Sequence, residues 1–200
     1  MKIIASAPCR ISLFGGGTDL PVFYEKHGGL VISMAINLKQ HIEFDTDAPK
    51  GISPEWAIPQ NGNVDFYGKF MDEFKLNRVF FVNKSDAPIQ SGLGSSASAA
   101  VALVAALSRI KGQNLTKEEI AEKAWDIEVN KLGLYGGKQD QYRAVYGGFG
   151  STRFKDYAIS TVYNAFVNND FWEERLMLFY TGETRKDPKI QERFKQLTLV

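Results

Sequence analysis

The chain contains very little cysteine and histidine. Among 200 residues, Cys9 is the single cysteine, and His27 and His41 are the only histidines. One thiol cannot form an internal disulfide, and these counts also exclude a multi-cysteine zinc site and a histidine-rich metal site. Because unpaired cysteine is typical of a reducing compartment, we expect a cytoplasmic protein in which Cys9 is a small packed residue and not a nucleophile.

A surplus of charge and a long apolar run are also missing. Lys and Arg number 24, Asp and Glu number 23, and the net charge is +1. This balance predicts no basic surface for nucleic acid or an anionic membrane, so the expected partners are small molecules or proteins. The longest apolar run, residues 97–107, is much shorter than the ~20 residues that span a bilayer. The apolar residues 3–5 are too few for a signal peptide, which needs ~7–15.

Helix and strand patterns alternate along the chain, which indicates a mixed α and β fold without internal repeats or a low-complexity linker. Periodicity and breakers predict strands at 2–7, 10–14, 30–34, 41–46, 78–82, 151–163 and 176–180. They predict helices at 20–27, 64–74, 99–110, 117–132, 140–146 and 189–197, and a loop at 50–62. Thr116 and Glu119 form the pattern of a capping box at the start of the helix 117–132.

A segment rich in glycine and serine is the first candidate site. Residues 88–98, PIQSGLGSSAS, hold two glycines and four hydroxyl side chains and lead into a helix that is apolar on nearly every side. Such a helix is buried. The backbone N–H groups at its start carry about half a positive charge and favour an anion, most often phosphate. The alternative is a plain helix-capping loop, although one cap needs only one hydroxyl.

Two better-known nucleotide motifs fit this segment poorly. No Walker A pattern occurs, because no lysine follows Gly94. Residues 92–97 match G-x-G-x-x-A, a weak dinucleotide signal that needs a strand directly before the first glycine. The predicted strand ends near Val82, so an NAD-dependent oxidoreductase is a poor interpretation.

Glu128 falls on the apolar stripe of its predicted helix. Ala121, Ala124, Trp125 and Leu132 form this stripe at helical spacing, and Glu128 lies among them. A carboxylate on a core face costs several kcal/mol unless it is paired or bound to a metal. One hypothesis is a buried ion pair with a basic residue. The other is a Mg²⁺ ligand, because Mg²⁺ takes one or two carboxylates together with phosphate oxygens.

Three further residues have both a structural and a functional interpretation. Asp140 follows Gly136 and Gly137 and is either a helix N-cap or a general base held near a substrate hydroxyl. Asp19 stands before a predicted helix and is expected to be its N-cap. Arg10 begins a predicted strand, where a solvated strand end is the simplest interpretation.

Taken together, these segments resemble a known family. Residues 7–19, APCRISLFGGGTD, resemble the first signature of the GHMP small-molecule kinases. Residues 88–97 are similar to the second, phosphate-binding signature, P-x-x-x-G-L-G-S-S-A. Within the family, the D-glycero-D-manno-heptose 7-phosphate kinases and related sugar kinases look most similar, through FGGGTDLP at 14–21, QDQY at 139–142, YGGF at 146–149 and FYTG at 179–182 with Arg185.

The resemblance implies a role for each candidate residue. Asp140 would take the proton of a sugar hydroxyl, with Arg10 beside it to favour the ionised carboxylate and to stabilise the transferred charge. Ser96 and Glu128 would hold Mg²⁺. Asp19 would hydrogen-bond the sugar, together with Gly16, Gly17 and Thr18. The triphosphate of ATP would lie against Ser91, Gly92, Leu93, Gly94, Ser95, Ser96, Ala97 and Ser98.

The resemblance also implies a fold and a domain division. We expect an α+β GHMP kinase N-terminal domain, similar to domain 2 of ribosomal protein S5, over residues 1–170. Residues 171–200 would begin a ferredoxin-like C-terminal domain, whose glycine-rich third signature does not occur before Val200.

The implied activity is that of an ATP- and Mg²⁺-dependent sugar kinase. Its expected acceptor is the anomeric hydroxyl of D-glycero-D-manno-heptose 7-phosphate. Glu183, Lys186 and Asp187 stand where that subgroup is expected to have smaller polar residues. A kinase for a fucose- or galactose-type sugar and a non-catalytic sugar- or nucleotide-binding module are the alternatives. The oligomeric state is not determined by the sequence.

Overall fold

Five strands form one antiparallel sheet. The computed structural model describes residues 2–45, 47, 65–76, 80–88, 90–155, 158–165 and 169–182. Within these residues the strand order is β1-β2-β4-β5, and β3 pairs with β2 beside this path. The strands are β1 (Lys2–Phe14), β2 (Gly29–Asp45), β3 (Phe80–Ser85), β4 (Phe149–Lys155) and β5 (Ala158–Ala165).

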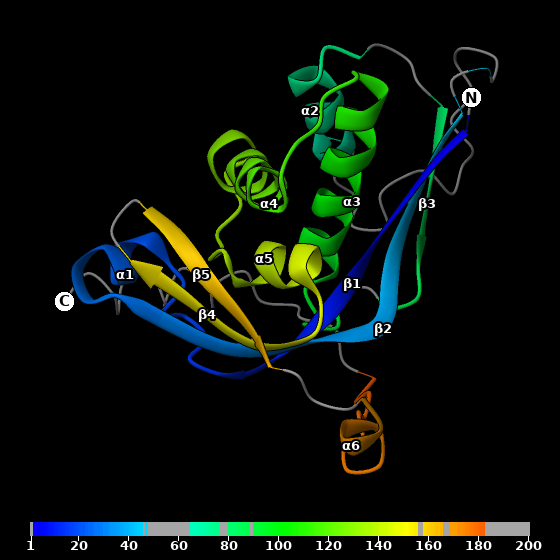
Figure 1. Ribbon diagram of the computed structural model, residues 1–200. Helices are drawn as coiled ribbons and strands as arrows, with labels where there is room; N and C mark the ends of the chain where they lie inside the picture. The colour runs from blue at the N-terminus through cyan, green and yellow to red at the C-terminus, as the bar shows by residue number, and fades with distance from the viewer. Residues whose placement is uncertain are drawn as a thin grey trace.

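Most of the helices cover one face of this sheet. Figure 1 shows α2, α3, α4 and α5 on that face and α6 on the opposite side of the sheet. The arrangement confirms the predicted α+β class. The helical elements are α1 (Pro21–His27), α2 (Asp65–Glu73), α3 (Ser95–Ile110), α4 (Lys117–Asp126), the π-helical turn η2 (Ile127–Lys131), α5 (Gln139–Tyr146) and α6 (Asn169–Glu173).

The first two strands are longer than expected. The sequence predicts a break at Pro8, yet β1 continues through it with a register shift between Pro8 and Arg10. Proline has no N–H for the ladder, and a bulge is one of the few places in a sheet that accepts it. The predicted strands 30–34 and 41–46 are likewise two parts of β2, one paired with β4 and the other with β3.

The core lies between α3 and the sheet. Leu103, Val104 and Leu107 of α3 are completely buried, which confirms the prediction of a helix without a polar face. Ile42 and Phe44 meet them from β2, as the alternation of that segment predicts. Burying each large side chain contributes about 1.5–3 kcal/mol, so this layer fixes the position of α3 on the sheet.

The helix after residue 116 starts as predicted and then changes from an α-helical to a π-helical pattern. Glu119 N donates to Thr116 Oγ1 at 3.2 Å and Thr116 N donates to Glu119 Oε2 at 2.7 Å, which confirms the capping box. The sequence predicts one α-helix to residue 132, but the α-helical pattern stops at Asp126 and the turn η2 follows. Turns of this kind are rare and often occur at functional sites. Glu128 lies in η2.

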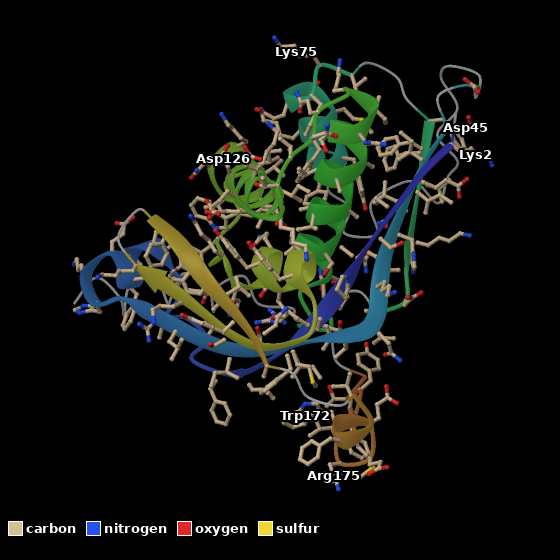
Figure 2. All side chains as sticks on the ribbon, viewed as in Figure 1. Lys2, Asp45, Lys75, Asp126, Trp172 and Arg175 are labelled. Atoms are coloured by element: carbon tan, nitrogen blue, oxygen red, sulfur yellow. The ribbon has the colours of Figure 1, made fainter. Side chains whose placement is uncertain are left out.

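The C-terminal part departs most from the expected elements. Residues 149–155 and 158–165 form the two paired strands β4 and β5 instead of one strand at 151–163. The predicted strand 176–180 is wrong, because this segment is exposed and pairs with no strand among the described residues. Figure 2 shows Trp172 on the side of the sheet opposite α3 and α5. The predicted loop 50–62 and helix 189–197 lie outside the described residues.

Two simple expectations can be compared with the described part of the chain. Cys9 is completely buried, as a packed residue should be, and its burial raises the pKa of the thiol. In the same part of the chain, the helices are too short or too polar to span a membrane.

Candidate active site

A bidentate ion pair joins the first strand to α5. Arg10 Nε donates to Asp140 Oδ1 at 2.6 Å, and Arg10 Nη2 donates to Asp140 Oδ2 at 2.6 Å. The Arg10 side chain is only 12% exposed, so the expectation of a solvated strand end is wrong. The N-cap alternative for Asp140 is also wrong, because Lys138 occupies that position and makes no side-chain cap bond. Asp140 instead lies in the first turn of α5, where the helix dipole favours a negative charge.

The glycine-serine loop lies directly against this pair. Arg10 Nη1 donates to the carbonyl of Gly92 at 2.7 Å, and Arg10 N donates to the carbonyl of Leu93 at 2.9 Å. A Cβ on Gly94 would lie 3.1 Å from Asp140 Oδ2 and 3.3 Å from Arg10 Cζ, and the residue has a φ of +73°. The fold therefore brings together the predicted phosphate loop and the predicted base, which are 46 residues apart (94 to 140) in the sequence.

The hydroxyls near this loop are not simple helix caps. Gly94 is the N-cap of α3 and has no side-chain cap bond. Ser98 Oγ donates to the carbonyl of Pro8 at 2.7 Å and so ties the helix to β1. The first backbone N–H groups of a helix, here those of Ser95, Ser96 and Ala97, have no acceptor within the helix. Binding of an anion by this loop stays a prediction.

Glu128 is buried and held at both oxygens. It is 5% exposed; Ser96 Oγ donates to Oε1 at 2.6 Å and Gln141 Nε2 donates to Oε2 at 2.7 Å. Burial raises the pKa of Glu128 to about 7, because the ionised form loses its hydration. None of the ion pairs among the described residues includes Glu128, so the buried ion-pair hypothesis finds no support there.

Among the described residues, the site contains three carboxylates, Asp19, Glu128 and Asp140, and one bonded cation, Arg10. Burial raises the pKa of Asp19 and of Glu128, and the negative charge of Asp140 adds to both shifts. Arg10 is the single cation bonded to any of the three carboxylates in the described part of the chain. Such a site favours a cation, and the paired hydroxyl of Ser96 and carboxylate of Glu128 are oxygen donors of the kind that Mg²⁺ uses with phosphate oxygens. No group of three His, Cys, Asp or Glu placed to hold a metal occurs among the described residues.

Asp19 differs from the sequence prediction. It does not cap α1, because Leu20 is the N-cap and makes no side-chain bond. It is 3% exposed and accepts from Gly17 N at 3.0 Å, from Gln139 N at 3.1 Å and from Gln139 Nε2 at 3.3 Å. Asp19 therefore joins the glycine loop to the first turn of α5. Its contact with a sugar stays a prediction.

The rest of the glycine loop is held by the hydroxyl of Thr18. Thr18 Oγ1 donates to the carbonyl of Gly15 at 2.7 Å and accepts from Leu30 N at 3.1 Å. Gly16 is exposed and Gly17 is half-buried. The assignment of Gly16, Gly17 and Thr18 to the sugar stays a prediction.

Gly137 has no room for a side chain. A Cβ there would lie 1.9 Å from Asp19 Oδ2, whereas nothing lies within 4 Å of a Cβ on the neighbouring Gly136. We expect Gly137→Ala to displace Asp19 and to lower the free energy of unfolding by about 1–3 kcal/mol, the usual cost of overpacking. Urea unfolding of both alanine variants measures the difference. Equal stability of Gly136→Ala and Gly137→Ala would show that Asp19 is not held as described.

A buried arginine fixes the other end of α5. Arg143 is completely buried, and burial lowers its pKa to about 10. Its Nε donates to Ser33 Oγ on β2 at 3.1 Å, and its Nη1 donates to Gly147 O at 2.8 Å and to Asn164 Oδ1 on β5 at 2.8 Å. These bonds attach α5 to the sheet and so contribute to the position of Asp140.

The sequence assigned no role to two glutamines on either side of Asp140. Gln139 bonds Asp19, and Gln141 bonds Glu128. Amide side chains carry no charge and follow no spacing rule, so composition and periodicity gave no signal for them. The pattern Q-D-Q at the start of a helix was the only available indication.

Comparison with known proteins finds a family and several relatives that are similar to this chain. Residues 64–148 match the family described as GHMP kinases N terminal domain. The chain is 30% identical, over 98% of its length, to the D-glycero-alpha-D-manno-heptose 7-phosphate kinase of Campylobacter jejuni. It is 36% identical, over 91% of its length, to the mevalonate kinase of Pyrococcus horikoshii. It spans 64% of the first relative and 58% of the second.

A solved structure shows the same fold. The D-glycero-D-manno-heptose 1-phosphate kinase of Bacteroides thetaiotaomicron superposes with a TM-score of 0.70 at 26% identity. The match covers 87% of this chain and 63% of that protein.

Proposed function

Because the chain belongs to the GHMP kinases through its N-terminal domain, we propose that the protein transfers the γ-phosphoryl group of ATP to a sugar hydroxyl. The proposed acceptor is the anomeric hydroxyl of D-glycero-D-manno-heptose 7-phosphate. The contact between Gly94 and the Arg10–Asp140 pair is the observation that carries this proposal. It supports the proposal because the start of α3, whose backbone N–H groups would bind an anion, lies beside a carboxylate, and a kinase needs both at one point.

The loop would hold the nucleotide. Phosphoryl transfer depends mainly on positioning and on neutralising charge. The backbone N–H groups at the start of α3 would donate to phosphate oxygens, and residues 91–98 would surround the triphosphate. Mg²⁺, when bound, would neutralise phosphate charge, and Ser96 Oγ with Glu128 would be its protein ligands.

Asp140 would accept the proton of the sugar hydroxyl. Each oxygen of a carboxylate has two lone pairs, and Arg10 uses one on each, so both oxygens retain acceptor capacity. The hydroxyl oxygen would attack the γ-phosphorus as its proton moves to Asp140, and the bond to ADP would break. Arg10, fixed by Asp140 and Gly92, would lie near the transferred group and stabilise its charge.

Asp19 would act on the sugar side of the site. Its bonds to Gly17 and Gln139 hold the glycine loop against α5, next to Asp140. The loop residues Gly16, Gly17 and Thr18 would then form one wall around the sugar.

A second acceptor class is favoured by one comparison. The mevalonate kinase of P. horikoshii is 36% identical to this chain, a higher identity than that of the heptose phosphate kinase. Alignment over 98% of the chain favours the heptose phosphate kinase. A substrate panel of heptose 7-phosphate, galactose, fucose and mevalonate, each with Mg·ATP, distinguishes these acceptors. Binding of ATP and a sugar without transfer to any of them would identify a non-catalytic module.

Nucleotide selectivity is the first test of this proposal. We expect Mg·ATP to raise the free energy of unfolding by about 2.7 kcal/mol at ~100 times Kd, because a ligand that binds only the folded state stabilises it by mass action. NADH should give no such gain, since β3 ends at Ser85 and no strand of the described residues leads directly into Gly92, as a dinucleotide-binding turn requires. Thermal unfolding at matched ligand concentrations measures both. Equal stabilisation by NADH, or none by Mg·ATP, would contradict the proposed nucleotide site.

A further inference from the structure

Gln141 is a buried amide next to the proposed base. It follows Asp140 on α5, is 4% exposed, and donates through Nε2 to Glu128 Oε2 at 2.7 Å. Its Oε1 is buried and has no hydrogen-bond partner among the described residues. The only polar contact of this side chain in that part of the protein is therefore the one to Glu128.

The two oxygens of Glu128 have different surroundings. Oε1 accepts from Ser96, an exposed residue in the first turn of α3. Oε2 accepts from Gln141, which is buried. A cation that arrives with phosphates at the start of α3 therefore reaches Glu128 from the Oε1 side, while Oε2 is occupied.

Hydrogen bonds hold the backbone around Glu128, so a change in the position of its carboxylate would come from rotation of the side chain. The carbonyl of Glu128 accepts from Leu134 N at 3.0 Å, and the carbonyl of Ile127 accepts from Leu132 N at 3.0 Å, so η2 is closed. The terminal torsion of a glutamate is broad and can rotate easily. A buried donor on one oxygen limits that rotation.

From these contacts we infer that Gln141 is a positioning residue, which holds Glu128 as a one-oxygen ligand that presents Oε1 to the cation. The inference rests on the proposed function. Groups that orient metal ligands in this way change metal affinity by 10–100-fold in other proteins. Because Gln141 and Asp140 are neighbours on α5, the same helix would position the metal ligand and the base.

Binding of Mn²⁺ with a non-hydrolysable ATP analogue tests this role without measuring turnover. Free Mn²⁺ is followed by electron paramagnetic resonance in wild type, Gln141→Met and Gln141→Asn. Methionine keeps the volume and removes the donor, and asparagine keeps the amide but shortens its reach. We expect both variants to bind Mn²⁺ about 10-fold more weakly, with unchanged affinity for the analogue without metal.

The matched control is Gln40→Met. Gln40 is also buried, at 3% exposed, but lies on β2 and bonds Ser85. The Gln40→Met variant should lose stability, as Gln141→Met does, and should keep the Mn²⁺ affinity of wild type. Circular dichroism checks the folding of each variant. In the case that Gln141→Met does not fold, the Mn²⁺ affinity of Gln141→Asn is the test of the inference.

The possible results separate the inference from the proposed function. Wild-type affinity in the Gln141 variants would overturn the inference and leave the proposed function intact. An equal loss of metal-free nucleotide affinity would show a purely structural role and also overturn the inference. No binding of the Mn²⁺-nucleotide by wild type would overturn both.

Discussion

Replacing Asp140 by asparagine is expected to lower kcat by about 10²–10³-fold. Loss of a general base typically costs 10²–10⁴-fold, and a loose phosphoryl-transfer transition state needs less help from a base, so the lower half of that range applies. Asparagine has nearly the same shape as aspartate, so we expect the variant to fit beside Gly94 and to keep the fold. Asp72→Asn is the matched control, because Asp72 is exposed on α2, far from α5 in sequence.

Arg10→Ala should act on the same step as Asp140→Asn. The two side chains form one bidentate pair, so each variant removes the pair's function and the double variant should cost little more than either single variant. Steady-state kcat for the two single variants and the double variant measures this coupling. An Asp140→Asn enzyme with wild-type kcat would mean that Asp140 serves only to hold Arg10.

Replacing Glu128 by glutamine is expected to have opposite effects on stability and on metal binding. The pKa of Glu128 in the folded protein is about 7, raised from 4.5 by burial. A raised carboxyl pKa means that the ionised form destabilises the fold. This cost is absent below about pH 4.5, grows as pH rises to about 7, and is fully present above that value.

The glutamine variant should therefore gain stability relative to wild type as pH rises. The gain between about pH 4.5 and pH 8 is expected to reach about 3 kcal/mol, since each pKa unit corresponds to about 1.4 kcal/mol. Urea unfolding without metal, at both ends of this range, measures it, and any constant packing effect of the substitution cancels in the difference. Mg²⁺ affinity should fall in the same variant, because a charged ligand is lost. A variant that is equally destabilised at both pH values and binds Mg²⁺ normally would show that Glu128 is structural.

Local signals in the sequence predicted several elements correctly. The apolar run of α3 and the Thr116–Glu119 capping box depend on neighbouring residues, and both are confirmed. The predicted helix 20–27 does end at His27, where Gly28 follows as the C-cap with a φ of +71°. Such features depend on short-range geometry, which the sequence contains directly.

Features that depend on distant partners could not be predicted in the same way. The continuity of β1 through Pro8 depends on pairing with β2, which no local pattern shows. The segment 176–180 is a short continuous apolar run of the kind found in buried strands, but a strand also needs a neighbour. The local sequence predicts a solvated Arg10, whereas the fold places Asp140 beside this side chain and buries most of it.

The candidate site shows the same division. The apolar stripe around Glu128 correctly predicted a buried carboxylate. The contact of Arg10 with Asp140 was expected only from the resemblance, because these residues are separated by 130 positions. Asp19 and Asp140 were each assigned a possible capping role that α1 and α5 do not use, since local patterns cannot distinguish a cap from a residue bonded across the fold.

Phosphoryl transfer itself is the most direct test of the central claim, that Asp140 accepts the proton of a sugar hydroxyl as this hydroxyl attacks the γ-phosphorus of ATP. ³¹P NMR of the whole protein with Mg·ATP and heptose 7-phosphate follows the γ-phosphoryl group, with Asp140→Asn in parallel. We predict a new sugar phosphate signal with wild type and a strongly slowed one with the variant. Release of inorganic phosphate alone, or equal rates for wild type and Asp140→Asn, would contradict the account.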